Sequence, residues 1–272
     1  MTLSDQPIPV TVVIPCYCAG TSIARALASV LAQTRMPAEV IMIDDASPDG
    51  SLAKLTELAS LHPGWVKLLR LETNQGVASA RNAGWAMATQ RYIAFLDADD
   101  AWHPEKLAIQ YTYMSAIHDL VLCGHGHRVL QQAGIKPDWA LGKLLVRPMH
   151  KWSLLLRNQF ITPSVMVRRE IPHRFAEGRR FMEDRLLWLE VVCSGDRVAL
   201  LNLELAATYK VPYGERGLSS NLWEMTKADV SNYRILRDRG HLSTPVSLAF
   251  QLLSLIKLAR RLAKVVVWRL WS

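Results

Sequence analysis

The sequence predicts an α/β fold, in which helices flank a mainly parallel sheet and a helical appendage follows at the C-terminal end. Two observations predict it: short β-branched runs alternate with helical stretches over the first hundred residues, and polar or acidic residues follow the runs directly. Such alternation forms parallel βαβ units, which bind ligands at the carboxyl ends of their strands. Half of the 272 residues are hydrophobic and 21% are charged, as expected of a folded chain.

The pattern places the elements in order along the chain. The first four strands are expected at the runs VTVVI from Val10, EVIMI from Glu39, WVKLLRL from Trp65 and RYIAFL from Arg91. The accompanying helices are expected at 21–34, 50–61, 75–89 and 104–117. Further strands are expected near 119–130, 163–168 and 197–210, with helices near 182–194 and from Asn221. The sequence therefore predicts one domain over 1–220, in halves of about 8–118 and 119–220, and a helical tail over 221–272.

Charge and cysteine content limit the partners and the compartment. Thirty-two lysines and arginines against 24 acidic residues give a net charge of +8, which favours a partner that carries phosphates. Charge alone does not distinguish a nucleotide from a nucleic acid or an anionic membrane. Four cysteines are too few for a disulfide framework, and the N-terminal residues do not resemble a secretory signal. No run of about 18 apolar residues occurs, so we expect a cytoplasmic protein without a membrane span.

Three aspartates, Asp97, Asp99 and Asp100, follow the fourth expected strand. Carboxylates crowded at the end of a buried strand need a cation or hydrogen-bond donors, because like charges repel and desolvation is costly. Their hard oxygens suit Mg²⁺ or Mn²⁺, ions that commonly take one or two carboxylates together with phosphate oxygens and waters. The alternative is an acidic loop that caps the next helix through Asp100.

Two further segments follow the second and third expected strands. Asp44 and Asp45 could accept hydrogen bonds from a ribose hydroxyl or a base N–H, and the alternative is an Asx turn that caps the following helix. Asn74, Gly76 and Arg81 bring small and basic residues to the start of a helix, which suits a phosphate group. The alternative there is a tight helix–sheet contact through the glycines, with Arg81 on a solvated face.

Common nucleotide-binding signatures are missing from the sequence. The first expected strand is followed by PCYC rather than G-x-G-x-x-G, and no G-x-x-x-x-G-K-[ST] occurs. These absences argue against a dinucleotide dehydrogenase and a P-loop enzyme. A nucleotidylyltransferase would need a glycine-rich, basic loop where this chain has PCYCAGTS.

Taken together, the motifs resemble those of the family 2 nucleotide-sugar glycosyltransferases, which have the GT-A fold, a Rossmann-like sheet flanked by helices. The resemblance rests on VVIPCYC, SVLAQT, IDDASPDGS, NQGVASARNAG, FLDADDAWHPEKL and FMEDRLLWLEVV. It covers roughly residues 8–220. It implies that the half over 8–118 binds the nucleotide sugar and that the half over 119–220 binds the acceptor.

The resemblance also assigns residues to the donor pocket. Pro15 and Tyr17 match the segment that lines the nucleotide, and Asp44 and Asp45 match the acidic pair at the base and ribose. Cys18 stands where the family commonly has asparagine, a departure that concerns only a local turn.

The catalytic assignments follow from the same resemblance. Asp97 and Asp99 match the Asp-x-Asp motif, in which the last aspartate usually ligates the metal that holds the donor diphosphate. Asp184 matches the catalytic base of inverting members, whereas its alternative is an acid at the start of an exposed helix. The segment that carries Lys210 and Arg216 matches a mobile loop over the diphosphate, and its alternative is a solvated surface loop.

In the tail, polar residues recur every three or four positions on an otherwise apolar helix. They are Ser247, Gln251, Ser254, Lys257, Arg261 and Lys264. Together with Trp268 and Trp271, this pattern fits a helix over 241–272 that lies in an anionic bilayer surface. The alternative is a helix packed on the catalytic domain or on a second subunit.

The resemblance combines these expectations into one activity. It implies a metal-dependent, inverting glycosyltransferase of the hexosyltransferase type that uses Mn²⁺ or Mg²⁺. The donor is a nucleotide sugar, with UDP favoured, the acceptor is a glycan or a lipid-linked glycan in polysaccharide biosynthesis, and no nucleic acid takes part. The Gln-x-x-Arg-Trp signature of processive members is absent, which favours a single addition. We expect a cytoplasmic location, with peripheral contact to the cytoplasmic face of a membrane if the tail helix lies in a bilayer and none if it packs on protein. The alternative is a catalytically inactive nucleotide-sugar binding or assembly protein on the same fold.

Overall fold

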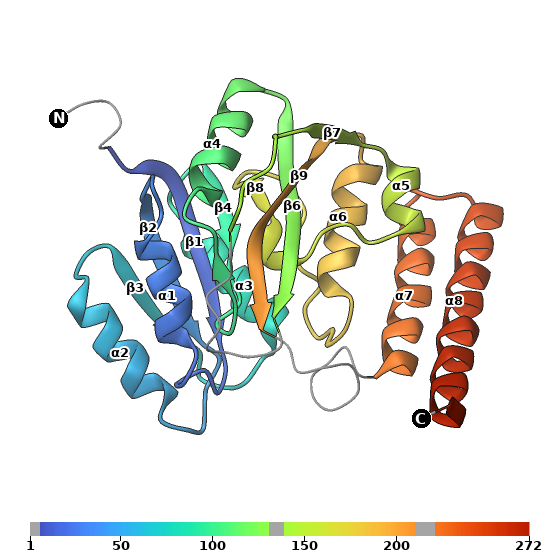
Figure 1. Ribbon diagram of the computed structural model, residues 1–272, viewed down its shortest axis with the longest axis horizontal. Coiled ribbons are helices and arrows are strands. Elements are labelled where there is room, and N and C mark those ends of the chain that lie inside the picture. Colours follow the sequence, from blue (N-terminus) through green and yellow to red (C-terminus); the bar gives the residue numbers. More distant parts are fainter. Residues whose placement is uncertain (1–5, 131–138, 210–220, 272) are drawn as a thin grey trace.

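The computed structural model describes residues 6–130, 139–209 and 221–271, with the side chains of the last helix described as far as Ala263. Within these residues, helices cover both faces of one central sheet, and two long helices lie side by side at one edge of the molecule (Figure 1). The nine strands of the sheet follow the order β3-β2-β1-β4-β8-β6-β9-β5, and β7 pairs with β9. The α/β class that the sequence predicts is confirmed.

The first half of the chain forms the parallel part of the sheet. Its strands are β1 (Ile8–Cys16), β2 (Pro37–Asp44), β3 (Val66–Arg70) and β4 (Tyr92–Phe95). Their helices are α1 (Ile23–Leu31), α2 (Ser51–Leu61) and α3 (Val77–Met87), and α4 (Lys106–Ala116) follows later. Strand β1 pairs in parallel with both β2 and β4, and β2 pairs in parallel with β3. Each predicted strand and helix of this half is present, with bounds shifted by a few residues.

The second half completes the sheet with mixed pairings. Its elements include β6 (Leu120–Leu130), β8 (Met166–Arg168), α6 (Glu183–Cys193) and β9 (Arg197–Tyr209). Strand β8 is antiparallel to β4 and β6, whereas β6 and β9 are parallel to each other. The parallel character therefore belongs to β3-β2-β1-β4 and to the β6–β9 pair.

Several short elements are not predicted by the sequence pattern. They are β5 (Ala101–Trp102), β7 (Val146–Met149), α5 (Lys151–Leu156) and a 3₁₀ turn at Thr162–Ser164. Both β5 and β7 pair antiparallel with β9. The sequence gives little signal for them, because β5 and the 3₁₀ turn have only two and three residues, β7 contains Arg147 and Pro148, and α5 is shorter than two helical turns.

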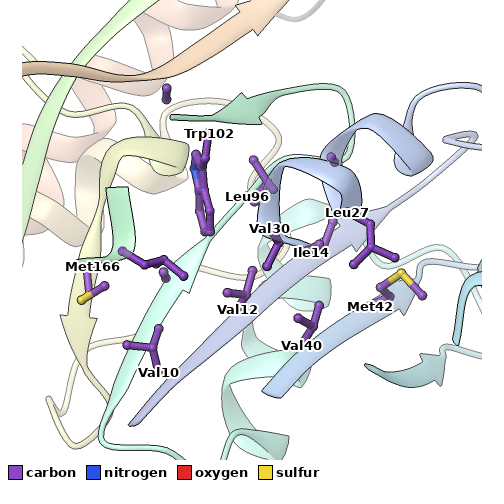
Figure 2. Close-up of a cluster of buried hydrophobic side chains, with 14 of the residues drawn as sticks. Val10, Val12, Ile14, Leu27, Val30, Val40, Met42, Leu96, Trp102 and Met166 are labelled. Carbon is purple, nitrogen blue, oxygen red and sulfur yellow. The ribbon is translucent and has the colours of Figure 1, made fainter. Parts of the chain in front are cut away.

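Two buried clusters, one on each face of the sheet, form the core. The alternation along β1 divides its side chains between them: Val10, Val12 and Ile14 lie in one cluster, and Val13 lies in the other. Helices α1, α2 and α4 cover the first face, where Leu27 and Val30 of α1 pack near β1 (Figure 2). Helices α3, α5, α6 and α7 cover the second. Because both faces are buried, β1 is hydrophobic almost throughout.

The C-terminal helices α7 (Leu222–Asp238) and α8 (Thr244–Trp271) pack against each other at one edge of the molecule (Figure 1). Asn221 caps α7, because its side chain accepts a hydrogen bond from the Glu224 N–H at 3.1 Å. Tyr233 and Leu236 of α7 are buried in the same cluster as α6. Among the described residues, no helix is long and apolar enough to cross a bilayer.

Candidate active site

The predicted donor residues gather at the carboxyl ends of β1 and β2. Pro15 lies in β1 opposite Ile43 of β2, and Tyr17 follows the strand with an exposed side chain. The backbone N–H of Cys18 donates to Ser47 Oγ at 3.1 Å, so the segments after the two strands are held together. Cys18 has a φ of 51°, a left-handed conformation that asparagine tolerates better than most residues do.

Asp45 holds the segment that leads into α3. Its carboxylate oxygens accept hydrogen bonds from the backbone N–H of Gln75 at 2.8 Å and of Gly76 at 2.9 Å. Its carbonyl oxygen accepts one from Asn74 Nδ2 at 3.3 Å. Gly76 has a φ of 85°, which glycine adopts at little cost, and α3 begins at the next residue. The structure thus brings Asp45, Asn74 and Gly76 together, with the Asp45 carboxylate turned toward the backbone.

Asp44 is fully buried beside Asp45. Its Oδ1 accepts a hydrogen bond from the Ser47 N–H at 3.3 Å, so the local-turn interpretation describes part of its environment. Its Oδ2 lies 3.9 Å from Nε of Arg70, and no hydrogen-bond donor reaches this oxygen within the described part of the chain. A buried acceptor of this kind can take a donor from a ligand.

Arg81 forms the centre of the site. Its Nη2 lies 2.7 Å from Oδ1 of Asp97, and its Nη1 lies 3.0 Å from Oε1 of Glu183. Burial alone would lower the pKa of Arg81, but the two carboxylates raise it above its usual value. The guanidinium therefore stays charged and joins the end of β4 to the start of α6. The alternative that placed Arg81 on a solvated face is wrong, because its side chain is buried.

The position of Arg81 depends on how closely α3 approaches the sheet. A Cβ atom at Gly84 would lie 2.6 Å from Val13 Cγ1 and 2.7 Å from Ile43 Cδ1, so only glycine allows this contact. The predicted tight contact through glycine is therefore present at Gly84. It directs Arg81, three residues earlier on the helix, into the protein interior.

Glu183 and Asp184 begin α6. Met182 precedes them with a φ of 57°, and the Asp184 Oδ1 accepts a hydrogen bond from the Arg185 N–H at 2.6 Å. Burial raises the pKa of Asp184, and the nearby Asp97 adds to that increase while Arg81 opposes it. Burial and the Asp184 carboxylate likewise raise the pKa of Glu183. A carboxylate whose pKa is raised binds a proton more readily, which is the property required of a general base.

The three aspartates after β4 have different environments. Asp97 contacts Arg81, Asp100 is buried with its N–H donating to the Asp97 carbonyl at 3.0 Å, and Asp99 is exposed. Arg25 Nη2 donates to the Asp99 carbonyl oxygen at 2.5 Å. Helix α4 begins only at Lys106 with Glu105 before it, so Asp100 does not cap that helix.

The donor set suits a metal shared with a substrate. Across residues 6–130, 139–209 and 221–271, no three His, Cys, Asp or Glu side chains form a group that could enclose an ion by themselves. The exposed Asp99 carboxylate, beside Asp97, offers hard oxygens that fit Mg²⁺ or Mn²⁺ when phosphate oxygens supply the remaining ligands. These residues therefore fit the divalent cation that the sequence predicts.

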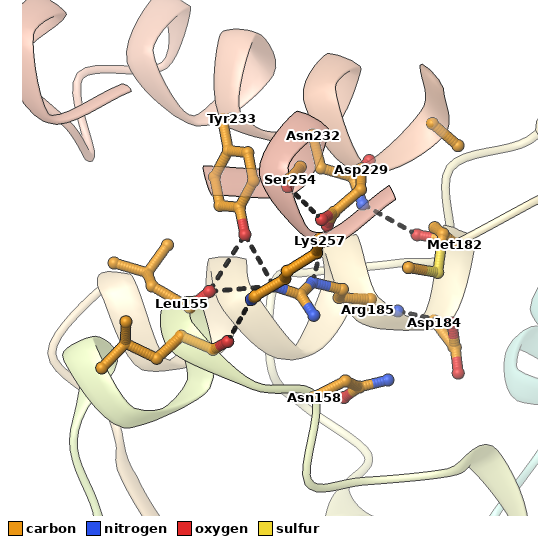
Figure 3. Close-up of polar contacts among 12 residues, drawn as sticks. Leu155, Asn158, Met182, Asp184, Arg185, Asp229, Asn232, Tyr233, Ser254 and Lys257 are labelled. Atoms are coloured by element: carbon orange, nitrogen blue, oxygen red, sulfur yellow. Dashed lines mark hydrogen bonds and ion pairs between the residues drawn. The ribbon is translucent and has the colours of Figure 1, made fainter. Parts of the chain in front are cut away.

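A buried network connects α6 to the C-terminal helices (Figure 3). Arg185 Nε forms an ion pair with Asp229 Oδ1 of α7 at 2.9 Å, and its Nη2 donates to Tyr233 Oη at 2.7 Å. Ser254 of α8 donates to Asp229 Oδ2 at 2.6 Å. The residue after Asp184 is thus anchored to both helices of the tail.

A second contact fixes the start of α6. Asn232 Nδ2 donates to the Met182 carbonyl at 3.1 Å, and Asn232 Oδ1 accepts from Arg179 Nη2 at 2.6 Å. Sequence reasoning missed this network and the role of Glu183. The pairing of Arg81 with Glu183 joins residues far apart in the chain, and no local pattern marks such a pair. Lys210 and Arg216, expected to lie over the diphosphate, fall outside the described residues.

Comparison with known proteins agrees with this geometry. The family model described as "Glycosyl transferase family 2" matches residues 11–171. The chain is 28% identical over 219 residues to the Escherichia coli UDP-Glc:alpha-D-GlcNAc-diphosphoundecaprenol beta-1,3-glucosyltransferase WfgD, covering 80% of this chain and 82% of that protein. It is 30% identical over 228 residues to the putative teichuronic acid biosynthesis glycosyltransferase TuaG of Bacillus subtilis strain 168, covering 83% and 87%.

One further relative and two solved structures extend the comparison. An uncharacterized glycosyltransferase of Nostoc is 43% identical over 98 residues, which cover 36% of this chain and only 30% of that protein. S. aureus TarS in complex with UDP-GlcNAc has a TM-score of 0.65 at 20% identity, over 82% of this chain and 66% of that chain. The Pyrobaculum calidifontis mannosyltransferase PcManGT, in complex with GDP-Man and Mn²⁺, has a TM-score of 0.60 at 18% identity, over 98% and 83%. These structures share the fold. The chain is a glycosyltransferase and belongs to glycosyl transferase family 2.

Proposed function

We propose that this glycosyltransferase moves a sugar from a UDP-linked donor to a hydroxyl group of a lipid-linked glycan, with inversion at the sugar carbon. The observation that carries the proposal is the buried Arg81, which contacts Asp97 at 2.7 Å and Glu183 at 3.0 Å. This ion-pair chain holds the carboxylates after β4 and the start of α6 beside one another. At one end of this ion-pair chain, Asp97 is proposed to help bind the donor. At the other end, Glu183 directly precedes Asp184, the proposed catalytic base.

The nucleotide is proposed to bind at the ends of β1 and β2. Asp44 Oδ2 is a buried oxygen that no hydrogen-bond donor reaches among the described residues, so it can accept one from the ribose or the base. Asp45 keeps the segment from Asn74 to Gly76 in place, and Pro15 and Tyr17 would line the same pocket. A UDP donor is favoured because the name of WfgD specifies UDP-Glc.

Asp184 is proposed to act as the general base. As the acceptor oxygen forms its bond to the anomeric carbon, the bond from that carbon to the diphosphate oxygen breaks. The acceptor hydroxyl proton passes to an Asp184 carboxylate oxygen, and the electron pair of the broken bond remains on the nucleoside diphosphate. Attack from the face opposite the leaving group inverts the configuration. The raised pKa of Asp184 favours its acceptance of this proton.

Asp99, with Asp97 beside it, would hold the divalent cation. When bound, Mn²⁺ or Mg²⁺ neutralises charge on the diphosphate, and Mn²⁺ accompanies GDP-Man in the structure of PcManGT. Both Nη atoms of Arg81 contact carboxylates, so Arg81 would affect the donor indirectly, by holding Asp97 in position.

The acceptor is inferred from the relatives. The WfgD name specifies a diphosphoundecaprenol-linked sugar, and TuaG is named for teichuronic acid biosynthesis. A lipid-linked acceptor would bring this chain to the cytoplasmic face of a membrane, in the synthesis of a surface polysaccharide.

Nucleotide release from UDP-, GDP- and dTDP-sugars, measured with and without Mn²⁺, tests the donor and the metal together. We expect Mn²⁺-dependent release from a UDP-sugar, and we expect Asp99→Asn to abolish the Mn²⁺-dependent part of donor affinity. Unchanged Mn²⁺-dependent affinity in that variant would contradict the metal assignment. If UDP-sugars bind but release no nucleotide even with a lipid-linked acceptor present, the chain is a binding protein instead.

A further inference from the structure

Helix α8 packs on the protein through its polar side. Ser247, Gln251 and Ser254, which recur at three or four positions, are all buried. Ser247 Oγ donates to the Tyr233 carbonyl at 2.9 Å, and Gln251 Oε1 accepts from Arg234 Nε at 3.1 Å. The first three residues of the polar stripe that the sequence predicts therefore face α7, whereas Lys257 reaches α5 and Arg261 is exposed. That part of the helix packs on the protein, as the alternative predicts.

The opposite side of α8 exposes its large apolar residues. Their side chains are between 47% and 59% exposed, and they are Leu248, Leu252, Leu255, Ile256 and Leu262. Positions separated by three, four and seven residues lie on one face of a helix, so these side chains form a continuous stripe. A soluble helix normally buries such a stripe, whereas α8 leaves it exposed.

Helix α5, which packs beside α8, adds two further exposed apolar side chains. Trp152 and Leu156 of α5 are about half exposed, and Trp152 stacks on Phe250 of α8 with ring centroids 6.4 Å apart. Lys257 of α8 donates to the Leu156 carbonyl at 2.5 Å. We call the apolar stripe of α8 together with Trp152 and Leu156 the α5–α8 apolar surface. It lies at the edge of the molecule remote from β1, β2 and β3 (Figure 1).

Basic residues surround this surface. The sequence of α8 contains five lysines and arginines and no acidic residue, and no acidic residue occurs after Asp238. Arg260 and Arg261 are exposed on α8, and Lys151 and Arg157 stand at the two ends of α5. A second copy paired through α8 would set these like charges against one another, which is unfavourable. An anionic surface with an apolar interior complements both features.

We propose that the α5–α8 apolar surface docks on a bilayer that contains anionic lipids, with α8 lying in the plane of the membrane. Leucine, isoleucine and tryptophan side chains would enter the boundary between headgroups and acyl chains, while lysines and arginines contact lipid phosphates. Docking does not depend on the proposed reaction, although it would bring the active site to a lipid-linked acceptor. The occupant is thus a membrane surface and not a second copy of the chain.

Sedimentation of the full chain with lipid vesicles tests the proposal. We expect it to sediment with vesicles of phosphatidylcholine and phosphatidylglycerol, to sediment far less with phosphatidylcholine alone, and to dissociate as salt concentration rises. Leu252→Glu/Ile256→Glu should lower partitioning at least tenfold. The matched control is Leu61→Glu in α2, at a position that is 62% exposed, and it should bind like the wild type.

Circular dichroism melting checks that each variant is folded, and UDP-sugar binding, which involves none of these residues, should stay unchanged in all of them. Either of two outcomes overturns the proposal: a wild type that does not bind anionic vesicles, or a double variant that binds them as well as the wild type does. In the first case, a wild-type dimer that is seen by light scattering, and that Leu252→Glu/Ile256→Glu converts to a monomer, would make a second copy the occupant.

Discussion

Arg81 and Glu183 lie 102 positions apart in the chain and form a buried ion pair of 3.0 Å between Nη1 and Oε1. Because Arg81 also contacts Asp97, one guanidinium links the strand end that is proposed to bind the donor with the helix that carries the proposed base. The packing of α3 on the sheet and the position of the start of α6 therefore determine how the proposed active site is arranged.

Arg81→Met is expected to destabilise the protein by about 3 kcal/mol or more, because it leaves the buried Glu183 carboxylate and the partly exposed Asp97 carboxylate without their cation. Adding Glu183→Gln removes one of those charges and should recover part of the loss. Urea unfolding of both single variants and the double variant measures the coupling. Strictly additive free energies of unfolding would contradict the ion-pair interpretation.

Arg185→Met is expected to lower the transfer rate while leaving the affinity for the donor nearly unchanged, because Arg185 anchors the start of α6 through Asp229. Steady-state kinetics measures both quantities, and the rate is divided by the concentration of folded protein found by circular dichroism, since a loss of folded protein alone would also lower the apparent rate at constant KM. The matched control is Arg197→Met, which breaks an exposed pair with Asp119 at 3.1 Å and should change neither quantity. Equal effects of the two substitutions would refute the positioning role.

The pH dependence of sugar transfer should reflect the protonation of the Asp184 carboxylate. Burial raises its pKa, and the base works only when deprotonated, so activity should fall as pH drops through a value above about 3.9, the usual aspartate pKa. Asp97→Asn removes a like charge that raises the pKa of Asp184 and should move this acidic limb to lower pH. The control Glu57→Gln, at an exposed pair with Lys54, should leave the limb in place. A shift to higher pH in Asp97→Asn would contradict the interpretation.

Glu39 should contribute to stability in a pH-dependent way. Burial would raise its pKa, but hydrogen bonds from Lys67, Thr11 and Thr89 lower it to about 2, below the ordinary 4.5. Its contribution is therefore complete above about pH 4.5 and is lost as pH falls toward 2. Glu39→Gln should cost about 2 kcal/mol at pH 7 and progressively less at acidic pH, as measured by denaturant unfolding. A pH-independent cost would rule out the carboxylate as its source.

The parallel half of the fold follows directly from the sequence, because β1, β2 and β4 are apolar runs whose pattern differs from that of the helices between them. The motif positions after these strands predict which side chains meet at their carboxyl ends. Asp45, Asn74 and Gly76 are together as expected, since the ends of neighbouring parallel strands meet at one edge.

Contacts between distant elements could not be predicted in this way. The burial of Arg81 depends on Gly84 lying against Val13 and Ile43, and its pairing with Glu183 depends on how α6 docks. The sequence of α8 predicts a helix with a stripe of regularly spaced polar residues, but it does not determine which face of the helix packs on the protein. The polar face packs because Tyr233, Asp229 and Arg234 of α7 supply hydrogen-bond partners to it.

In the proposed reaction, Asp184 accepts the proton of the acceptor hydroxyl. The most direct test of this role compares wild-type and Asp184→Asn protein, with donor affinity and sugar transfer to a lipid-linked acceptor measured on the same preparations. Asparagine keeps the size of the side chain but cannot accept a proton at neutral pH. We expect unchanged donor affinity and a loss of transfer of about a hundredfold or more. Turnover close to that of the wild type in Asp184→Asn would contradict the role of Asp184 as the base.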